Sequence, residues 1–189
     1  MKAIARTLLV LAALLALPAH ADATLPGNSV YRLAAPLADQ AGKHFSLAER
    51  RGKPALVSMF YNSCEFVCPM LIDTMRMTEE ALSADERSQL AMLLITFDPA
   101  RDSVAVLRKV ADQRQLDAAR WTVARPDPAN ARKIAAVLDI KYRQLANGEF
   151  SHTTVLVLLD KEGRVVGQTN KMGVTDPAFV ALIHKTLQH

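Results

Sequence analysis

The strongest constraint on the fold is an apolar strand that leads directly into two cysteines and then a helix. Residues 54–61 (PALVSMFY) form a strand-sized apolar run, which the polar residues 62–63 end. Cys64 and Cys68 follow, and Pro69 suits the first turn of a helix. Apolar residues then repeat at helical spacing at Leu71, Ile72, Met75 and Leu82. The cysteines are therefore predicted where a buried strand passes into the amino terminus of a helix.

Strands and helices alternate along the rest of the chain. Strands are predicted at 90–97, 121–124, 153–159 and 164–169, and helices at 69–82, 103–114, 129–138 and from 176 onward. A short hairpin at 37–45 comes first, and a capping box at 83–86 opens a short helical turn. This order predicts an α/β domain whose mixed central sheet is flanked by helices on both faces.

The first 21 residues have the pattern of an export signal. Lys2 and Arg6 precede an uncharged apolar stretch at 7–17, and the sequence PAHA at 18–21 fits a signal peptidase site. A retained membrane anchor is the alternative, but eleven helical residues span only about 16 Å, roughly half of a bilayer core. We therefore predict cleavage after Ala21 and a periplasmic protein.

Composition limits the remaining function classes. Residues 22–36 are predicted as a loose segment and residues 37–189 as one domain, a usual size for a single core. The net charge of +4 falls to +2 without the signal, which carries two basic residues and no acidic one. No basic cluster with interleaved aromatics occurs, so a nucleic-acid partner is not expected. The other long apolar runs, 90–97 and 155–159, are strand-sized, so no membrane span is expected in the mature chain.

The two cysteines, Cys64 and Cys68, are better suited to chemistry than to stabilising the fold. A lone pair in an oxidising compartment is usually a structural disulfide, and that interpretation stays open. However, a loop of three intervening residues removes little chain entropy, and a core of this size needs no crosslink. At a helix amino terminus, free N–H groups and the helix dipole favour thiolate over thiol.

A spacing of four residues predicts that both sulfurs lie on one face of a single helical turn. They can then form a disulfide with each other or bind one soft metal ion together. Two thiolates do not complete a structural zinc site, which needs four ligands. Copper(I) accepts two or three ligands and is favoured by thiolate softness, so a third ligand is sought among the histidines.

Only one histidine is placed where a ligand could lie. His44 in a turn, His184 on the last helix and the terminal His189 are all predicted to be in solvent. His152 directly precedes the strand at 153–159, at one end of the sheet. From the residues alone, it is equally a metal ligand or a histidine at the rim of the sheet whose ring nitrogens are hydrogen-bonded. Methionines near the cysteines are predicted to fill the core rather than bind metal: Met70, Met75 and Met77.

Several motifs together resemble a known family. The sequence YNSCEFVCP at 61–69 is similar to the Cys-x-x-x-Cys-Pro signature of the Sco/SenC proteins, thioredoxin-fold copper chaperones for cytochrome c oxidase. The sequence at 52–54 (GKP), the Asp-Pro-x-Arg-Asp run within 96–103 and the SHT at 151–153 also resemble family segments in the same order. The resemblance extends from about residue 37 to the carboxyl terminus.

The resemblance implies a thioredoxin-like fold in which Cys64, Cys68 and His152 bind copper together. It also implies that Asp98 lies near the cysteines, since carboxyl ends of neighbouring parallel strands face one crevice. A helix cap or an ion pair with Arg101 is the alternative role for Asp98. The implied partners are a copper-containing subunit of a respiratory oxidase and a thioredoxin-like reductase that keeps the cysteines reduced.

The cysteine loop departs from the family pattern. Family members usually carry Pro and Asp inside the loop and often Thr-His ahead of it, whereas this chain has EFV at 65–67 and NS at 62–63. Phe66 is predicted to be exposed beside the site, which suits docking of an apolar partner surface. The ligands are unchanged, so the departures concern the delivery target more than the metal.

These observations favour a periplasmic copper-binding assembly factor, which is not itself an enzyme. The alternative is a thiol–disulfide oxidoreductase, in which the two cysteines act as nucleophile and resolving thiol. The histidine and the three-residue spacing argue against it, because dithiol exchange needs no imidazole and usually has two intervening residues. Peroxide reduction by one activated cysteine is a third possibility with little local support.

Overall fold

The structure is a computed structural model that describes residues 25–188. The predicted signal at 1–21, its cleavage site and His189 lie outside the described residues. Among residues 25–188, no helix has both the length and the apolar character needed to cross a bilayer.

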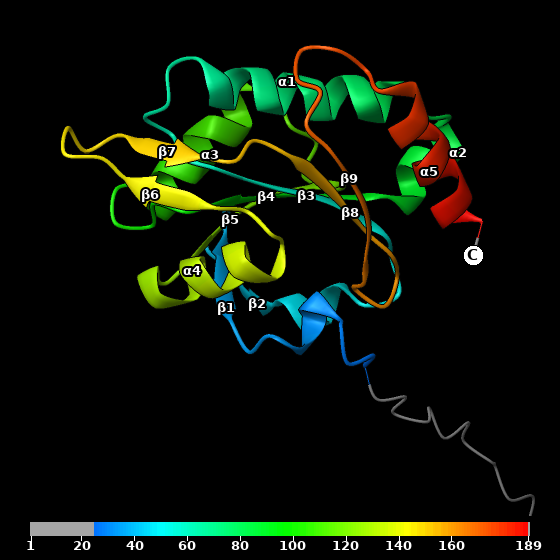
Figure 1. The fold of residues 1–189 in the computed structure, drawn as a ribbon, viewed down its shortest axis with the longest axis horizontal. Coiled ribbons are helices and arrows are strands. Elements are labelled where there is room, and N and C mark those ends of the chain that lie inside the picture. Colours follow the sequence, from blue (N-terminus) through cyan, green and yellow to red (C-terminus); the bar gives the residue numbers. More distant parts are fainter. Residues whose placement is uncertain (1–24, 189) are drawn as a thin grey trace, which may run out of the picture.

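The centre of the domain is a seven-stranded mixed sheet, as predicted (Figure 1). Its spatial order is β2-β1-β5-β4-β3-β8-β9. The strands are β1 (Pro36–Asp39), β2 (His44–Ser46), β3 (Ala55–Phe60), β4 (Ala91–Thr96), β5 (Trp121–Pro126), β8 (Leu156–Leu159) and β9 (Val165–Thr169). The three middle strands β3, β4 and β5 are parallel, and all other pairings in this sheet are antiparallel.

Helices cover both faces of this sheet. They are α1 (Val67–Glu80), α2 (Ala84–Gln89), α3 (Val104–Gln113), α4 (Pro128–Val137) and α5 (Pro177–Leu187), with 3-10 turns η1 (Val30–Arg32) and η2 (Leu47–Arg50). In Figure 1, α1 and α3 lie over one face, as right-handed crossovers between the parallel strands require, and α4 lies over the other face. Side-chain caps begin four of the helices, from Ser83, Ser103, Asp127 and Asp176.

The central position of β3 in the core explains why its sequence is a continuous apolar run. This strand lies between β4 and β8, and every one of its residues is buried because helices or loops cover both faces. Leu71 and Met75 on the inner side of α1 are fully buried against it. The start of α1 therefore packs into the same core as β3.

Two local predictions were wrong. A separate two-stranded hairpin, β6 (Tyr142–Gln144) and β7 (Phe150–His152), precedes β8, so the strand predicted at 153–159 begins only at Leu156. The hairpin residues are half-buried or exposed and have no apolar alternation, which is why the pattern did not indicate it. In addition, α1 begins at Val67, and Cys64 lies in the loop before the helix rather than on its first turn.

Candidate metal centre

The two cysteines approach each other at the start of α1. Phe66, the residue that caps α1, makes no side-chain capping hydrogen bond. Instead, the Cys68 backbone N–H donates to the Cys64 Sγ at 3.3 Å. The sulfur thus accepts a hydrogen bond from a helix N–H group that would otherwise lack a partner. Both cysteines are free thiols.

The two thiols differ in their readiness to ionise. Burial disfavours the thiolate of Cys64. Hydrogen bonds to its sulfur outweigh burial and lower the pKa of Cys64; they come from the Cys68 N–H and thiol and from the Phe66 and Val67 backbone. Burial raises the pKa of Cys68, which is only 3% exposed, and the nearby Cys64 charge adds to this rise. Cys64 is therefore the thiol that ionises more readily, and Cys68 keeps its proton until a cation replaces it.

His152 is the last residue of β7 and faces the cysteines from the other side. Its Nδ1 lies 3.3 Å from the Thr153 carbonyl, and in the tautomer that donates this hydrogen bond Nε2 keeps a free lone pair. Burial lowers the pKa of His152, although the Thr153 hydrogen bond opposes the shift. The lowered pKa favours the neutral ring, which is the form that binds a metal ion.

The structure brings Cys64, Cys68 and His152 together. One ligand atom from each lies within 4.8 Å of the others, and no other such group of metal-ligating side chains occurs within residues 25–188. Two thiols and one imidazole are a donor set suited to a soft cation of low coordination number. These residues can hold such an ion without a change of fold.

Asp98 is buried directly after β4 and forms an ion pair with Arg101, the alternative role considered for it. That Asp98 lies near the proposed metal ion remains a prediction. The carboxylate that holds the cysteine loop is Asp102, which accepts a hydrogen bond from the Asn62 N–H at 3.1 Å and another from Thr96. Burial raises the pKa of Asp102 against the effect of these two donors.

An aromatic cluster surrounds the histidine, and the sequence analysis did not identify it. Tyr61, Phe97, Tyr142 and Phe150 have ring centroids 4.8–6.0 Å apart, and Tyr61 and Phe97 also contact the His152 ring. The chain has only 6 Phe, 3 Tyr and 1 Trp. The position of these few aromatic residues next to the cysteine, Asp-Pro and histidine motifs was the sequence signal that could have identified the cluster. The rings of Tyr61 and Phe97 pack against the imidazole, which is half-buried.

The surface around the centre is open and partly apolar. Phe66 is 81% exposed, as predicted, and Met70 on α1 is also exposed. A cavity of about 190 Å³ beside both cysteines is lined on its other side by Val110 and Arg114. The exposed rim could admit a partner side chain to the sulfurs.

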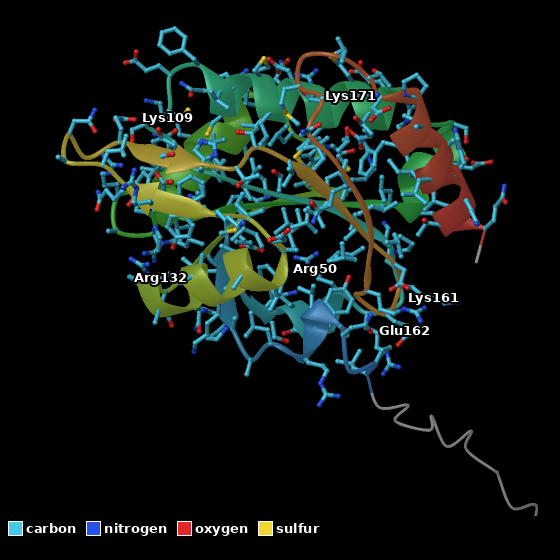
Figure 2. All side chains as sticks on the ribbon, viewed as in Figure 1. Arg50, Lys109, Arg132, Lys161, Glu162 and Lys171 are labelled. Atoms are coloured by element: carbon cyan, nitrogen blue, oxygen red, sulfur yellow. The ribbon has the colours of Figure 1, made fainter. Side chains whose placement is uncertain are left out.

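Two basic side chains lie at the hairpin end of the molecule. Figure 2 shows Lys109 of α3 and Arg132 of α4 at the end of the molecule that carries the hairpin. The Arg132 guanidinium lies 6.0 Å from the centre of the Tyr142 ring.

The other candidate residues lie elsewhere. His44 is exposed on the edge strand β2, as predicted. His184 on α5 is not simply solvated, because its Nδ1 lies 2.5 Å from Glu86 at the amino end of α2. Met75 is buried in the core, as predicted, but the same prediction was wrong for Met70, which is exposed on α1, and Met77 is only half-buried.

The fold and the site together define a thioredoxin-like protein that carries two thiols and an imidazole at the carboxyl edge of its sheet. The family model SCO1/SenC matches residues 31–188, and the chain belongs to that family.

Individual relatives agree with this assignment. The mitochondrial protein SCO1 of Saccharomyces cerevisiae is 28% identical over 133 residues, which cover 69% of this chain and 45% of that protein. The chain spans less than half the length of the curated relatives it matches.

Solved structures share the fold. Bradyrhizobium japonicum ScoI with copper bound has a TM-score of 0.68 and 22% identity, over 80% of this chain and 96% of that one. A SCO1/SenC family lipoprotein from Bacillus anthracis has a TM-score of 0.72 and 18% identity, over 80% and 91%. The predicted thioredoxin-like fold is confirmed.

Proposed function

We propose that this protein binds copper through Cys64, Cys68 and His152 and delivers it to a copper-containing subunit of a respiratory oxidase in the periplasm. The observation that carries the proposal is the approach of one ligand atom from each residue to within 4.8 Å of the others. Two sulfurs and one imidazole nitrogen are a donor set that selects copper(I) over hard cations and does not complete a structural zinc site.

The relatives support copper as the cargo. The structures of Bradyrhizobium japonicum ScoI and yeast Sco1 are both described with copper bound. The exposed Phe66 beside the cysteines suits contact with an apolar partner surface during delivery. Transfer would then proceed by exchange, in which each ligand of the partner replaces one of the three ligands here.

Each residue has a defined part in binding. Cys64 supplies the sulfur that ionises more readily, and Cys68 releases its proton when copper binds. His152 offers Nε2 while Nδ1 is held by the Thr153 carbonyl. Copper binding is therefore coupled to the release of a proton and weakens in acid.

Copper(I) affinity of the reduced, purified protein tests the proposal directly. We expect wild-type protein to bind one copper(I) ion in competition with a chromogenic chelator, and His152→Ala to bind it more weakly. Equal affinity in the two proteins would remove His152 from the site. Failure of the wild type to bind copper(I) would remove the function itself.

A second candidate function is thiol–disulfide exchange, which the unequal thiols favour. The more exposed Cys64 thiolate would attack a target disulfide and form a mixed disulfide; the buried Cys68 would then displace the target thiol. The target is reduced by two electrons, and the Cys64–Cys68 pair is oxidised to a disulfide. Turnover with a model disulfide, in protein that has no copper affinity, would favour this function over metal delivery.

Export and a reductase complete the proposal. The pattern at 1–21 supports secretion, and an oxidising compartment would convert the two thiols to a disulfide unless a thioredoxin-like partner reduced them. Cell fractionation and amino-terminal sequencing test the location. A mature protein beginning at residue 22 in the periplasmic fraction is the expected result.

A further inference from the structure

We propose that Tyr61 and Glu149 act as a clasp that holds the β6–β7 hairpin, and with it His152, against the two cysteines. The inference rests on the proposed copper site and names the positioning residues of that site. It concerns side chains that touch no metal themselves.

The hairpin needs such a clasp because the main sheet does not hold it. Within the part of the chain that the structure describes, β6 and β7 pair only with each other, and His152 lies opposite Tyr142. Backbone hydrogen bonds inside the hairpin, such as Leu145 N–H to the Glu149 carbonyl, fix its own shape. They do not fix its distance from Cys64 and Cys68, which side-chain contacts must therefore set.

Tyr61 reaches from the cysteine side to the hairpin. It follows β3 directly, is only 4% exposed, and its hydroxyl donates to the Glu149 Oε2 at 2.7 Å. The edge of one ring meets the face of the other between Tyr61 and His152, with centroids 5.8 Å apart and planes at 88°. One side chain thus holds the hairpin backbone through Glu149 and orients the imidazole through ring packing.

Tyr61 also contacts the other half of the centre. Burial, the Glu149 hydrogen bond and an interaction with the Cys64 thiol all raise the pKa of Tyr61, so its hydroxyl stays a neutral donor. Tyr61 and Cys64 line the same cavity, and the Cys64 N–H donates to the Tyr61 carbonyl at 3.3 Å, so Tyr61 links a sulfur ligand to the segment that carries the imidazole ligand.

A second contact holds the same turn from the opposite side. Arg101, in the loop after β4, donates from its Nη2 to the Gly148 carbonyl at 2.9 Å. Its guanidinium also lies 5.6 Å from the centre of the Phe150 ring, and the buried Asp98 carboxylate fixes it by an ion pair. Glu149 and its neighbour Gly148 are thus anchored to the ends of two adjacent parallel strands, β3 and β4.

Tyr61→Phe is the sharpest test, because it removes only the hydroxyl and keeps the ring packing. We expect copper(I) affinity to fall about tenfold, the lower end of what outer partners of metal ligands contribute. Glu149→Leu should give the same loss, and combining the two changes should cost no more than either one alone. Glu149→Gln should restore affinity to within about twofold of wild type, because its amide oxygen still accepts the Tyr61 hydrogen bond.

Tyr142→Phe is the matched control. Tyr142 belongs to the same aromatic cluster, stacked on Phe97 at 4.8 Å, but its hydroxyl makes no hydrogen bond within residues 25–188. Its removal should leave copper affinity unchanged. A loss equal to that of Tyr61→Phe would overturn the proposal, because any hydroxyl in the cluster would then matter equally.

Two readouts separate positioning from general stability. Hydrogen exchange in the copper-free protein should quicken at the Leu145 and Thr153 amides in Tyr61→Phe and Glu149→Leu, while the amides of β3 keep their protection. The thiolate-to-copper absorption of the copper(II) form should also shift in these two variants and not in Tyr142→Phe. Unchanged exchange and an unchanged spectrum in Tyr61→Phe would overturn the clasp.

The outcome for the clasp is distinguishable from that for the copper site. If wild-type protein bound no copper(I), the proposed function would fail, and exchange at the Leu145 and Thr153 amides would still decide whether Tyr61 holds the hairpin. If His152→Ala lost affinity but Tyr61→Phe did not, the copper site would stand and the clasp would fall.

Discussion

Cys64 and Cys68 lie at the joint between β3 and α1, whereas His152 lies on a two-stranded hairpin outside the main sheet. The cysteine side is continuous with the core, because β3 is wholly buried and α1 packs on it through Leu71. The histidine side depends on a few side-chain contacts made across long stretches of sequence. One half of the centre is therefore fixed by the fold, and the other half can shift while the fold stays intact.

The largest expected effect of this difference is on metal affinity. Cys68→Ser should lower copper(I) affinity by more than about 100-fold, since it removes a soft ligand from a buried, fixed position. His152→Ala should cost about 10- to 100-fold, because the two thiolates remain and can bind copper(I) in linear geometry. Competition titrations under reducing conditions measure both values. A larger loss for His152→Ala would reverse the roles assigned to the two halves.

The next effect is on global stability. Leu71→Ala should lower the free energy of unfolding by about 2–5 kcal/mol, because Leu71 is fully buried between α1 and the sheet. Tyr142→Ala on the hairpin should cost only about 1 kcal/mol, because its ring is half-exposed and lies outside the main sheet. Urea unfolding measures both changes, with the exposed Glu80→Ala on α1 as a control close to zero. Equal losses at the two positions would show that the hairpin belongs to the cooperative core.

The same contrast explains what could be predicted from the sequence. The cysteine side follows from local pattern: a continuous apolar run, a polar break and a helix stripe place Cys64 and Cys68 without any tertiary knowledge. The hairpin was missed because its half-exposed strands are only three residues long and have no alternation. From the residues alone His152 could equally have been a rim histidine, and only the family resemblance favoured it as a ligand.

The contacts that join the halves were beyond any local pattern. Tyr61 and Glu149 are 88 positions apart, and Arg101 and Gly148 are 47 apart. Asp98 and Arg101 lie three residues apart in one predicted loop, so an ion pair between them could be proposed from the sequence. The hydrogen bond from Asn62 to Asp102 joins residues 40 positions apart and could not be proposed in this way. Sequence reasoning thus identified the three candidate ligand residues but not the side chains that contact them from distant parts of the chain.

A smaller effect concerns delivery rather than binding. Phe66→Ser should leave stability within about 0.5 kcal/mol and copper(I) affinity unchanged, because the side chain is 81% exposed and contributes no ligand. Docking of the acceptor subunit should weaken by about tenfold, as for an exposed aromatic anchor at an interface. Val165→Ser on the edge strand β9 removes an exposed apolar side chain elsewhere and should not change docking. Copper transfer measured against acceptor concentration would reveal the difference, and equal transfer by the two variants would contradict it.

The smallest effect is a difference in how the two halves of the metal-free protein respond to pH. Burial raises the pKa of Asp102, which holds the cysteine loop, above its ordinary value of 3.8. The folded state then binds this proton more tightly than the unfolded state does. Its contribution to stability is complete below about pH 4 and is lost as the pH rises through the raised pKa.

His152 has the opposite sign. Burial lowers its pKa below the ordinary value of 6.5, so the unfolded state binds this proton more tightly. Its contribution is complete above about pH 6.5 and is lost as the pH falls through the lowered pKa. In wild-type protein, Asp102 should cause a loss of stability as the pH rises above 4, and Asp102→Asn should remove that loss. His152 should cause a loss of stability as the pH falls below 6.5, and His152→Asn should remove that one. Urea unfolding of both variants and wild type from pH 4 to pH 8 measures the two slopes. If both substitutions changed the same slope, the cysteine and histidine sides would titrate as one coupled unit rather than as two separately held halves.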